Sequence, residues 1–90
     1  MLPLNFAILR LFLEEDEADT ENVMDALSSN YRNFRQFTEK SITETLMTAE
    51  ANGLLEETRC ELDGDGRLHV YYRATATGRD MIDRYIRKPT

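Results

Sequence analysis

The chain has 90 residues, of which 41% are hydrophobic and 31% charged, and its formal net charge is −6. A chain of this length buries about 60% of the surface that it exposes when unfolded, which suffices for one core but leaves little room for an enclosed active site. We therefore expect a single globular domain over residues 1–90, which excludes a disordered chain and argues against an enzyme.

The acidic excess lies in residues 1–30, where Arg10 is the only basic side chain, whereas residues 31–90 are balanced in charge. Contacts from Lys and Arg to phosphate supply most nonspecific affinity for nucleic acid. The negative net charge of the chain therefore argues against nonspecific binding to nucleic acid, but it permits a local basic face. Cys60 has no partner for an internal disulfide, and neither a secretory signal nor a membrane span is evident. We expect a cytoplasmic protein that does not contact a membrane.

The first predicted helix spans Leu4 to Glu15, and apolar side chains surround its axis except at Asn5 and Arg10. A helix that is apolar on nearly all sides needs burial on more than one side. Either a second copy of the chain or the last helix of the same chain would cover the outer side. For a homodimer, the candidate interface residues are Leu4, Ile8, Leu11, Phe12, Ile82 and Tyr85.

Residues 14–19 are predicted to form a solvated acidic linker, because runs of like charge usually face water. Asp19 or Thr20 then caps a second helix. Its predicted buried stripe consists of Val23, Ala26 and Leu27.

The end of this second helix is ambiguous, because residues 28–30 are poor helix formers. The aromatic residues Tyr31, Phe34 and Phe37 follow at a spacing of three. We interpret them as a short turn that wraps the edge of the core, with Arg32 and Arg35 pointing outward between them.

The third predicted helix runs from Thr38 to Asn52, with Thr38 as its cap and Gly53 directly after its end. A capping-box pattern at Ser41 leaves open a start three residues later. Ile42, Leu46 and Ala49 form the predicted buried face. The predicted outward residues are Glu39, Lys40, Thr43, Glu44 and Met47.

A hairpin is predicted from two runs of alternating residues, Leu54–Leu62 and Leu68–Ala74, separated by a turn at residues 63–66. Pairing Leu62 with Leu68 brings opposite charges together across the strands. This register predicts an inner face of Cys60–Val70, Thr58–Tyr72 and Glu56–Ala74, and an outer face of Glu61–His69, Arg59–Tyr71 and Glu57–Arg73.

The last predicted helix begins after the cap Thr75 and runs from Ala76 to about Lys88. Its predicted apolar stripe consists of Met81, Ile82, Tyr85 and Ile86.

No motif of the sequence predicts catalysis or a cofactor. The aspartates of the hairpin turn do not match a calcium loop, because Leu68 stands at the glycine position and Ala74 at the position of the bidentate acid. Cys60 and His69 are too few for a zinc site and lie on opposite predicted faces, which also excludes a thiol nucleophile with its base.

Two groups of residues together resemble the winged helix-turn-helix domain of the PadR and MarR families of transcription regulators. The first is the helix exit Leu46, Ala49 and Asn52-Gly53-Leu54-Leu55, and the second is residues 71–79, which read YYRATATGR. The resemblance covers nearly the whole chain. It implies an α+β fold of three helices, a two-stranded β-hairpin wing and a C-terminal helix.

The resemblance also implies a homodimer that binds double-stranded DNA, with the third helix in the major groove and the wing at the phosphates or the minor groove. Carried over to this sequence, the candidate base contacts are Lys40, Thr43 and Glu44. The candidate phosphate contacts are Arg32, Arg35, Arg59, Arg67 and Arg73.

An alternative is a winged-helix module that binds another protein and not DNA, through the first helix or the acidic segment. A neutral or negative surface on the third helix and the wing would favour this alternative. Arg59 and Arg73 have cross-strand partners in the predicted register, so structural pairing is an alternative to phosphate contact for both.

Overall fold

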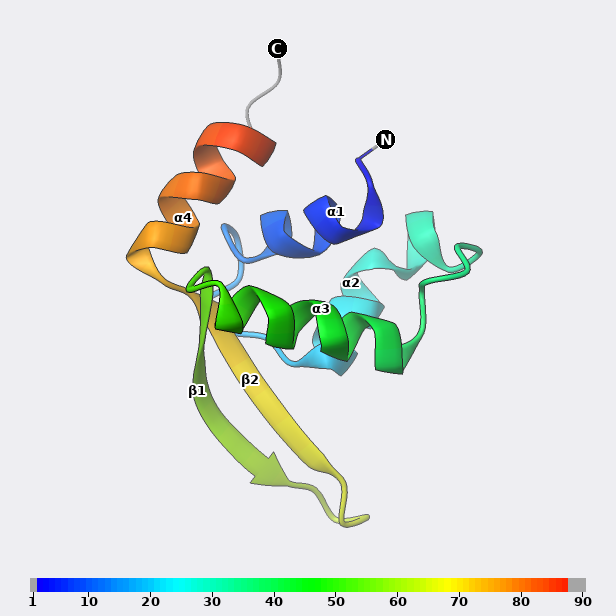
Figure 1. Cartoon of the computed structure of the whole chain (residues 1–90). Coiled ribbons are helices and arrows are strands. Elements are labelled where there is room, and N and C mark those ends of the chain that lie inside the picture. The colour runs from blue at the N-terminus through cyan, green and yellow to red at the C-terminus, as the bar shows by residue number, and fades with distance from the viewer. Residues whose placement is uncertain (1, 88–90) are drawn as a thin grey trace.

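The computed structural model describes residues 2–87 and has the α+β winged-helix architecture (Figure 1). None of its helices is both long and apolar enough to cross a bilayer, within the residues described. The elements in chain order are α1 (Leu4–Leu11), α2 (Thr20–Tyr31), α3 (Glu39–Ala51), β1 (Leu55–Leu62), β2 (Leu68–Ala74), α4 (Ala76–Ile82) and a π-helical segment, η1 (Asp83–Arg87). The predicted end of the last helix at Lys88 lies outside the described residues.

Side-chain caps fix where α2 and α3 begin. The Asp19 carboxylate accepts a hydrogen bond from the Asn22 amide at 2.7 Å, and the Asn22 side chain accepts one from the Asp19 amide at 3.1 Å. This reciprocal pair is a capping box. The Thr38 hydroxyl accepts from the Ser41 amide at 3.1 Å, so α3 begins at Glu39 and the later start at Ser41 is wrong.

Helix α1 ends at Leu11, four residues before the predicted end at Glu15. The Phe12 amide donates to the Leu9 carbonyl at 3.0 Å, a tightened last turn, and the Phe12 side chain is fully buried. The acidic run that begins at Glu14 would have faced the negative end of the helix macrodipole, which disfavours a longer helix.

Helix α2 buries Val23 and Tyr31, with Leu27 half-buried between them. Ala26 is exposed, so its prediction as a core residue is wrong. Residues spaced by four form one stripe on a helix, and Ala26 lies beside that stripe. The Tyr31 hydroxyl donates to the Leu2 carbonyl at 2.6 Å, which ties the end of α2 to the start of the chain.

Helix α3 buries Ile42, Leu46 and Ala49, as predicted. Its end is a Schellman motif, in which the Gly53 amide donates to the Glu50 carbonyl at 3.0 Å and the Leu54 amide to the Ala49 carbonyl at 2.9 Å. Gly53 has φ of 78°, in the left-handed region that glycine adopts without a steric penalty. The chain then turns directly into β1.

The start of α4 packs against this helix exit at what we call the junction (Gly53, Leu54, Thr75 and Gly78). The Thr75 amide donates to the Leu54 carbonyl at 3.0 Å, and the Thr75 hydroxyl donates to the Gly53 carbonyl at 2.7 Å. A Cβ atom on Gly78 would lie 1.9 Å from the Leu54 carbonyl oxygen. Only glycine therefore allows α4 to approach the exit of α3 this closely.

The hairpin, which we call the wing (β1, β2 and the turn at residues 63–67), has the predicted register over its outer half. Leu62–Leu68, Glu61–His69, Cys60–Val70 and Arg59–Tyr71 pair as expected.

Nearer the core, a bulge between Glu57 and Arg59 shifts the register by one residue. The shift places Leu55 in the core, where it is 1% exposed. The predicted pairs Thr58–Tyr72, Glu57–Arg73 and Glu56–Ala74 are therefore wrong, and the observed pairs are Glu57–Tyr72, Glu56–Arg73 and Leu55–Ala74.

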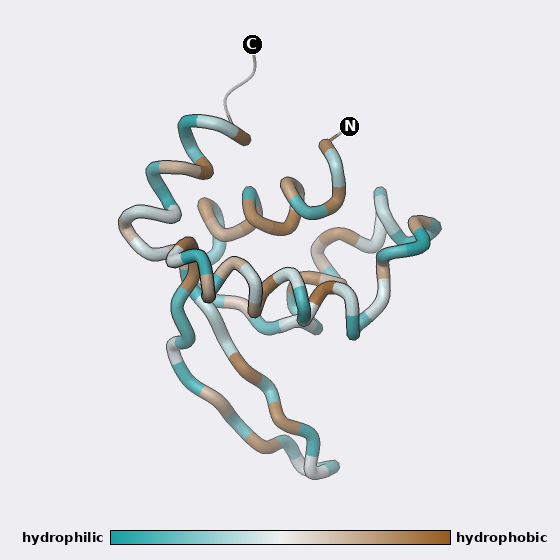
Figure 2. The backbone as a smooth tube through the Cα atoms, viewed as in Figure 1, coloured by the Kyte–Doolittle hydropathy of each residue, from teal (hydrophilic) through white to brown (hydrophobic). Residues whose placement is uncertain are grey.

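The predicted inner face is confirmed on β2, where Tyr72 and Ala74 are buried, but it is wrong on β1, and the predicted outer face is wrong at His69. The wing projects away from the helices, and its apolar residues are spread along both strands (Figures 1 and 2). Cys60 is exposed because no helix covers β1 beyond Leu55. His69, predicted to face solvent, has a side chain that is only 17% exposed.

Helix α1 is covered within the chain on the side where η1 packs against it. Four of the six residues predicted for a dimer interface are buried within the single chain, so they offer little surface to a second copy. They are Leu4, Ile8, Phe12 and Ile82, each no more than 7% exposed. Of the other two, Leu11 is half-buried and Tyr85 is exposed.

We expect Gly78→Ala to lower the free energy of unfolding by about 2–3 kcal/mol, because the new methyl group collides with backbone that cannot move without breaking the junction. Gly64→Ala is the matched control, since a Cβ there meets no atom within 4 Å, and a change within about 0.5 kcal/mol is expected. Urea denaturation followed by circular dichroism measures both. Equal stability of the two variants would show that α4 does not depend on this close approach.

Candidate nucleic-acid interface

Helix α3 presents a solvent-facing ridge, which we define as Lys40, Glu44 and Met47. Lys40 and Glu44 are exposed, and Met47 is 56% exposed. Thr43, predicted to share this surface, is half-buried, and its hydroxyl is hydrogen-bonded to that of Thr20 at 2.8 Å. Two of the three predicted base-contacting residues therefore lie together on the ridge, while Thr43 packs against the start of α2.

A groove of about 330 Å³ lies between α3, the start of α2 and β2. Apolar side chains of α3 and β2 line it together with five carboxylates and two basic groups. The lining residues are Asp19, Thr20, Glu21, Glu39, Thr43, Met47, Glu50, Glu57, Arg67, Leu68, His69, Val70 and Tyr72. The groove is therefore acidic, whereas the neighbouring ridge carries Lys40.

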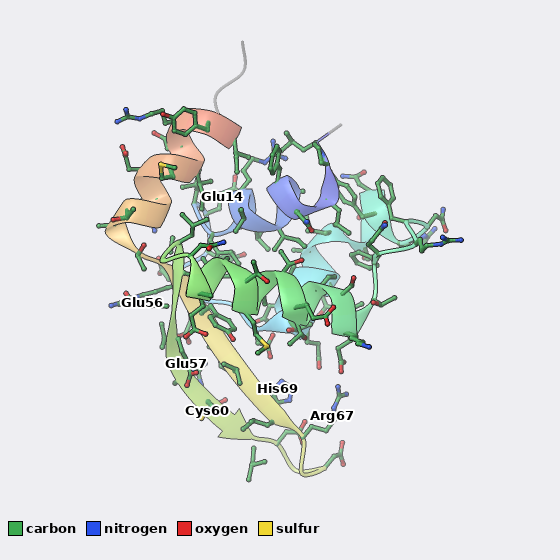
Figure 3. The ribbon with its side chains drawn as sticks, viewed as in Figure 1. Glu14, Glu56, Glu57, Cys60, Arg67 and His69 are labelled. Atoms are coloured by element: carbon green, nitrogen blue, oxygen red, sulfur yellow. The ribbon has the colours of Figure 1, made fainter. Side chains whose placement is uncertain are left out.

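Arg67, at the tip of the wing, reaches back to the first residue of α3. Its guanidinium forms an ion pair with Glu39 at 2.7 Å, and both side chains are more than half exposed. Figure 3 shows Arg67 and His69 on the side of the wing that faces α3, with Glu56, Glu57 and Cys60 along the other strand. The predicted phosphate contact at Arg67 is thus partly neutralised in the free protein.

Arg59 is held on the wing by three neighbours. It forms ion pairs with Glu17, at 2.7 Å, and with Glu61, and its guanidinium lies 3.9 Å from the centre of the Tyr71 ring. The hydrogen bond to Glu17 raises the pKa of Arg59 above its ordinary value, and bonds from Thr58 and Arg59 lower the pKa of Glu17. Two carboxylates and a ring therefore already hold this guanidinium in the free protein, although its side chain is 42% exposed.

The remaining residues predicted to contact phosphate differ in whether a carboxylate pairs with them. Arg73 forms an ion pair with Glu56 across the strands at 2.7 Å. Arg32 and Arg35 lie in the exposed turn between α2 and α3, and neither they nor Lys40 forms an ion pair with any of residues 2–87. Three basic side chains without a carboxylate partner therefore lie at or just before the N-terminal end of α3, and others lie on α1 and α4.

His69 links the wing to the start of α2 through what we call the clasp (Asp19, His69 and Asp63). Its Nδ1 lies 2.8 Å from Oδ2 of Asp19, and its Nε2 lies 2.8 Å from Oδ2 of Asp63. Both acceptors are carboxylates, so both ring nitrogens donate only when the imidazole is protonated. The hydrogen bonds to Asp63 and Asp19 raise the pKa of His69 above 6.5.

Asp63 also organises the turn of the wing. Its Oδ1 accepts from the Asp65 amide at 2.8 Å and from the Arg67 amide at 3.0 Å. The bond from His69, aided by these amides, lowers the pKa of Asp63 to about 2. The clasp and the turn therefore share one carboxylate.

The prediction of a solvated acidic linker fails at Glu17 and Asp19. Ala18 pairs with Tyr72 through two backbone hydrogen bonds of 2.9 Å, which lays this segment along β2. Glu17 then reaches Arg59, and Asp19, 3% exposed, reaches His69. The sequence did identify Asp19 as a candidate cap, but it contains no local signal for the strand-like contact at Ala18.

We expect the imidazole of His69, the only histidine of the chain, to titrate above pH 6.5, as followed by its ring proton resonances in NMR. Because folding raises this pKa, the stabilisation is fully present below about pH 6.5 and is lost as pH rises through the folded pKa. Because folding lowers the pKa of Asp63, its contribution is present above about pH 4 and is lost as pH falls toward 2. Asp63→Asn should lower the pKa of His69, whereas Asp65→Asn, in the same turn, should leave it unchanged.

An imidazole that titrates at or below pH 6.5 would contradict the clasp, as would a His69 pKa that Asp63→Asn leaves in place.

Comparison with known proteins identifies similar structures. No protein-family model matches the sequence, and neither does any curated protein. The structure is similar to Bacillus subtilis PadR in complex with operator DNA, with a TM-score of 0.75 and 17% identity, over 97% of this chain and 48% of that chain. It is also similar to a PadR-like transcriptional regulator from Bacillus cereus strain ATCC 14579, with a TM-score of 0.67 and 23% identity, over 90% of this chain and 75% of that chain.

The chain thus spans about half the length of the PadR chain that it resembles. At these identities the likeness establishes the fold, and it confirms the predicted resemblance to the PadR winged helix. The resemblance to MarR regulators stays a prediction.

Proposed function

We propose that this chain is a cytoplasmic transcription regulator that binds double-stranded DNA as a homodimer. The observation that carries the proposal is the ridge of α3, which stands free of the core beside the wing with Lys40 exposed and unpaired within residues 2–87. Further support is the fold, since the similar PadR structure is a complex with operator DNA. In such folds a helix of this kind reads base edges in the major groove.

On the ridge, the ammonium group of Lys40 suits the O6 and N7 acceptors of guanine, and the Glu44 carboxylate suits the N4 amine of cytosine. Thr43 is less suited to base contact, because its hydroxyl is bonded to Thr20. We therefore narrow the proposed base contacts to Lys40 and Glu44.

The phosphate contacts that we propose are Arg32, Arg35 and Arg67. The first two have no carboxylate partner within the described part of the chain. Arg67 would exchange Glu39 for a phosphate, a small net cost because exposed ion pairs contribute little stability. Arg59 and Arg73 keep their roles in the wing, where Glu17 and Glu56 hold them.

For the homodimer, we propose the surface formed by α1, α4 and η1. Exposed apolar side chains gather on these elements, with Phe6 46%, Met81 43% and Tyr85 67% exposed. Leu11, half-buried, lies on the same helix as Phe6. A dimer of this kind would recognise a palindromic site whose half-site spacing follows the distance between the two copies of α3.

We expect Lys40→Ala and Arg67→Ala to have different effects on DNA binding. Loss of a base contact costs about 1–3 kcal/mol at one base pair and relaxes the preference there, whereas loss of a phosphate contact weakens all sequences alike and reduces the salt slope by about 1. Selection of bound duplexes from a random pool, followed by fluorescence anisotropy at several salt concentrations, measures both. Arg73→Ala is the control, because Arg73 pairs with Glu56 on the wing and is not among the proposed DNA contacts.

Absence of binding to any selected duplex at low salt would refute DNA recognition. Equal losses in all three variants would refute the assigned surface.

We expect Tyr85→Ser to weaken the homodimer about ten-fold or more, as loss of a buried interface aromatic does. Sedimentation equilibrium over a range of protein concentrations measures the dissociation constant. Phe34→Ser is the control, since Phe34 is an exposed aromatic that lies in the turn after α2. A wild-type chain that sediments as a monomer would exclude the dimer.

A second candidate function is a protein-binding module that has the fold without the DNA contacts. The acidic groove beside α3 favours it, because five carboxylates there oppose the approach of phosphate. The DNA-binding experiment above distinguishes the two functions.

A further inference from the structure

One edge of β2 is open beside the groove. The Tyr72 amide and carbonyl point away from β1, because both bond to Ala18. Backbone groups alternate in direction along a strand, so those of Val70 and Leu68 point to the same edge. The direction of the neighbouring residue supports this assignment, since the Arg67 carbonyl points toward β1 and accepts from the Asp63 amide across the hairpin.

The strand-like pairing along this edge of β2 ends at Asp19. Beyond the pair Ala18–Tyr72, a continued strand would have run alongside Val70 and Leu68, but Asp19 caps α2 and the chain turns into the helix instead. Within residues 2–87, no backbone group beyond β1 bonds to Leu68 or Val70. Unpaired backbone groups of an edge strand are a template for another strand.

The groove along this edge has an apolar floor and an acidic rim. Met47 and Leu68 are 56% and 60% exposed, although both line the groove. Glu50 and Glu57 line the groove together with Tyr72, whose pKa is raised by burial and by these two carboxylates. Glu21 lies on α2 and lines the groove as well.

We propose that this groove binds an extended, basic segment of another protein, which adds as an antiparallel strand to the edge of β2 at Leu68 and Val70. Main-chain hydrogen bonds give affinity in such additions, and side-chain pockets give specificity. Because Met47, Leu68, Glu50 and Glu57 lie on one side of the added strand, the segment has its apolar and its basic residues on the face that meets α3: the apolar ones lie against the floor and the basic ones reach the rim. The site does not depend on DNA binding by the ridge.

A basic protein segment fits this groove better than the other available occupants. Duplex DNA would bring phosphates against five carboxylates, of which Arg67 and a protonated His69 neutralise only part. The β2 strand of a second copy would bring the same acidic rim toward itself. Charge complementarity therefore selects a cationic strand.

The test uses the full chain and a fluorescent peptide whose valines and lysines share the strand face that meets α3, read by anisotropy at low salt. We expect a dissociation constant on the order of 100 μM, as for a small interface. Two control peptides separate the contributions: one has glutamate in place of lysine, and the other has N-methylated valines that cannot donate to β2. Both controls should bind at least ten-fold more weakly.

Matched protein variants locate the site. The double variant Glu50→Gln/Glu57→Gln and the control Glu14→Gln/Glu15→Gln change the net charge equally, but only the first alters the groove. We expect the groove variant to bind about five-fold more weakly and the control to bind as the wild type does. Equal weakening in both would show attraction to overall charge and overturn the proposal.

Amide exchange identifies the edge directly. Saturating peptide should slow exchange of the Leu68 and Val70 amides, with no change at Gly64 in the solvent turn. The proposal is overturned if no peptide binds at 1 mM, if the methylated peptide binds equally, or if duplex DNA or higher protein concentration protects these two amides instead. Because the peptide measurements contain no DNA, their failure and a failure of DNA binding are separate results.

Discussion

The structure depends most on the contact between the backbone of Leu54 and the start of α4. The left-handed conformation of Gly53 directs the chain out of α3. The Leu54 carbonyl then accepts from the Thr75 amide, and Gly78 leaves room for that carbonyl against α4. Since β1 leaves and β2 returns at this point, the junction sets the direction of the wing relative to α3. The two sequence groups that resemble the PadR winged helix, the exit of α3 and residues 71–79, meet at this contact through Leu54, Thr75 and Gly78.

Features governed by neighbouring residues were predictable from the sequence. Asp19, Thr38 and Thr75 act as caps, Gly53 ends α3, and the outer half of the hairpin has the expected register, because each depends on a few adjacent residues. The bulge at Glu57 was not predictable, since it follows from where Leu55 enters the core. The inner face was predicted wrongly on β1 for a related reason: alternation assumes a core on one side, and most of β1 has none.

The candidate interface was predictable only in part, because its charges are set by contacts between distant residues. Lys40 and Glu44 could be placed on an exposed helix face from periodicity alone. The ion-pair partners of the arginines could not be predicted from the sequence, since Glu17 reaches Arg59 and Glu39 reaches Arg67 across long stretches of sequence. A balanced charge in residues 31–90 therefore says little about which cations are free. In the folded chain, three unpaired cations lie near the N-terminal end of α3, others lie on α1 and α4, and five carboxylates line the groove.

Asp19 connects these two surfaces. Its carboxylate starts α2 by accepting from Asn22, and the turn that this cap imposes ends the strand-like pairing after Ala18. The edge of β2 is open for that reason, and the same carboxylate holds His69 beside the opening. A longer strand at residues 17–22 would close the edge but would remove the first turn of α2, which packs against α3 through Thr20 and Thr43. Placing α3 on α2 therefore leaves the outer edge of β2 at Leu68 and Val70 without a neighbouring strand, so the position where α2 begins determines both the acidic groove and the exposed ridge.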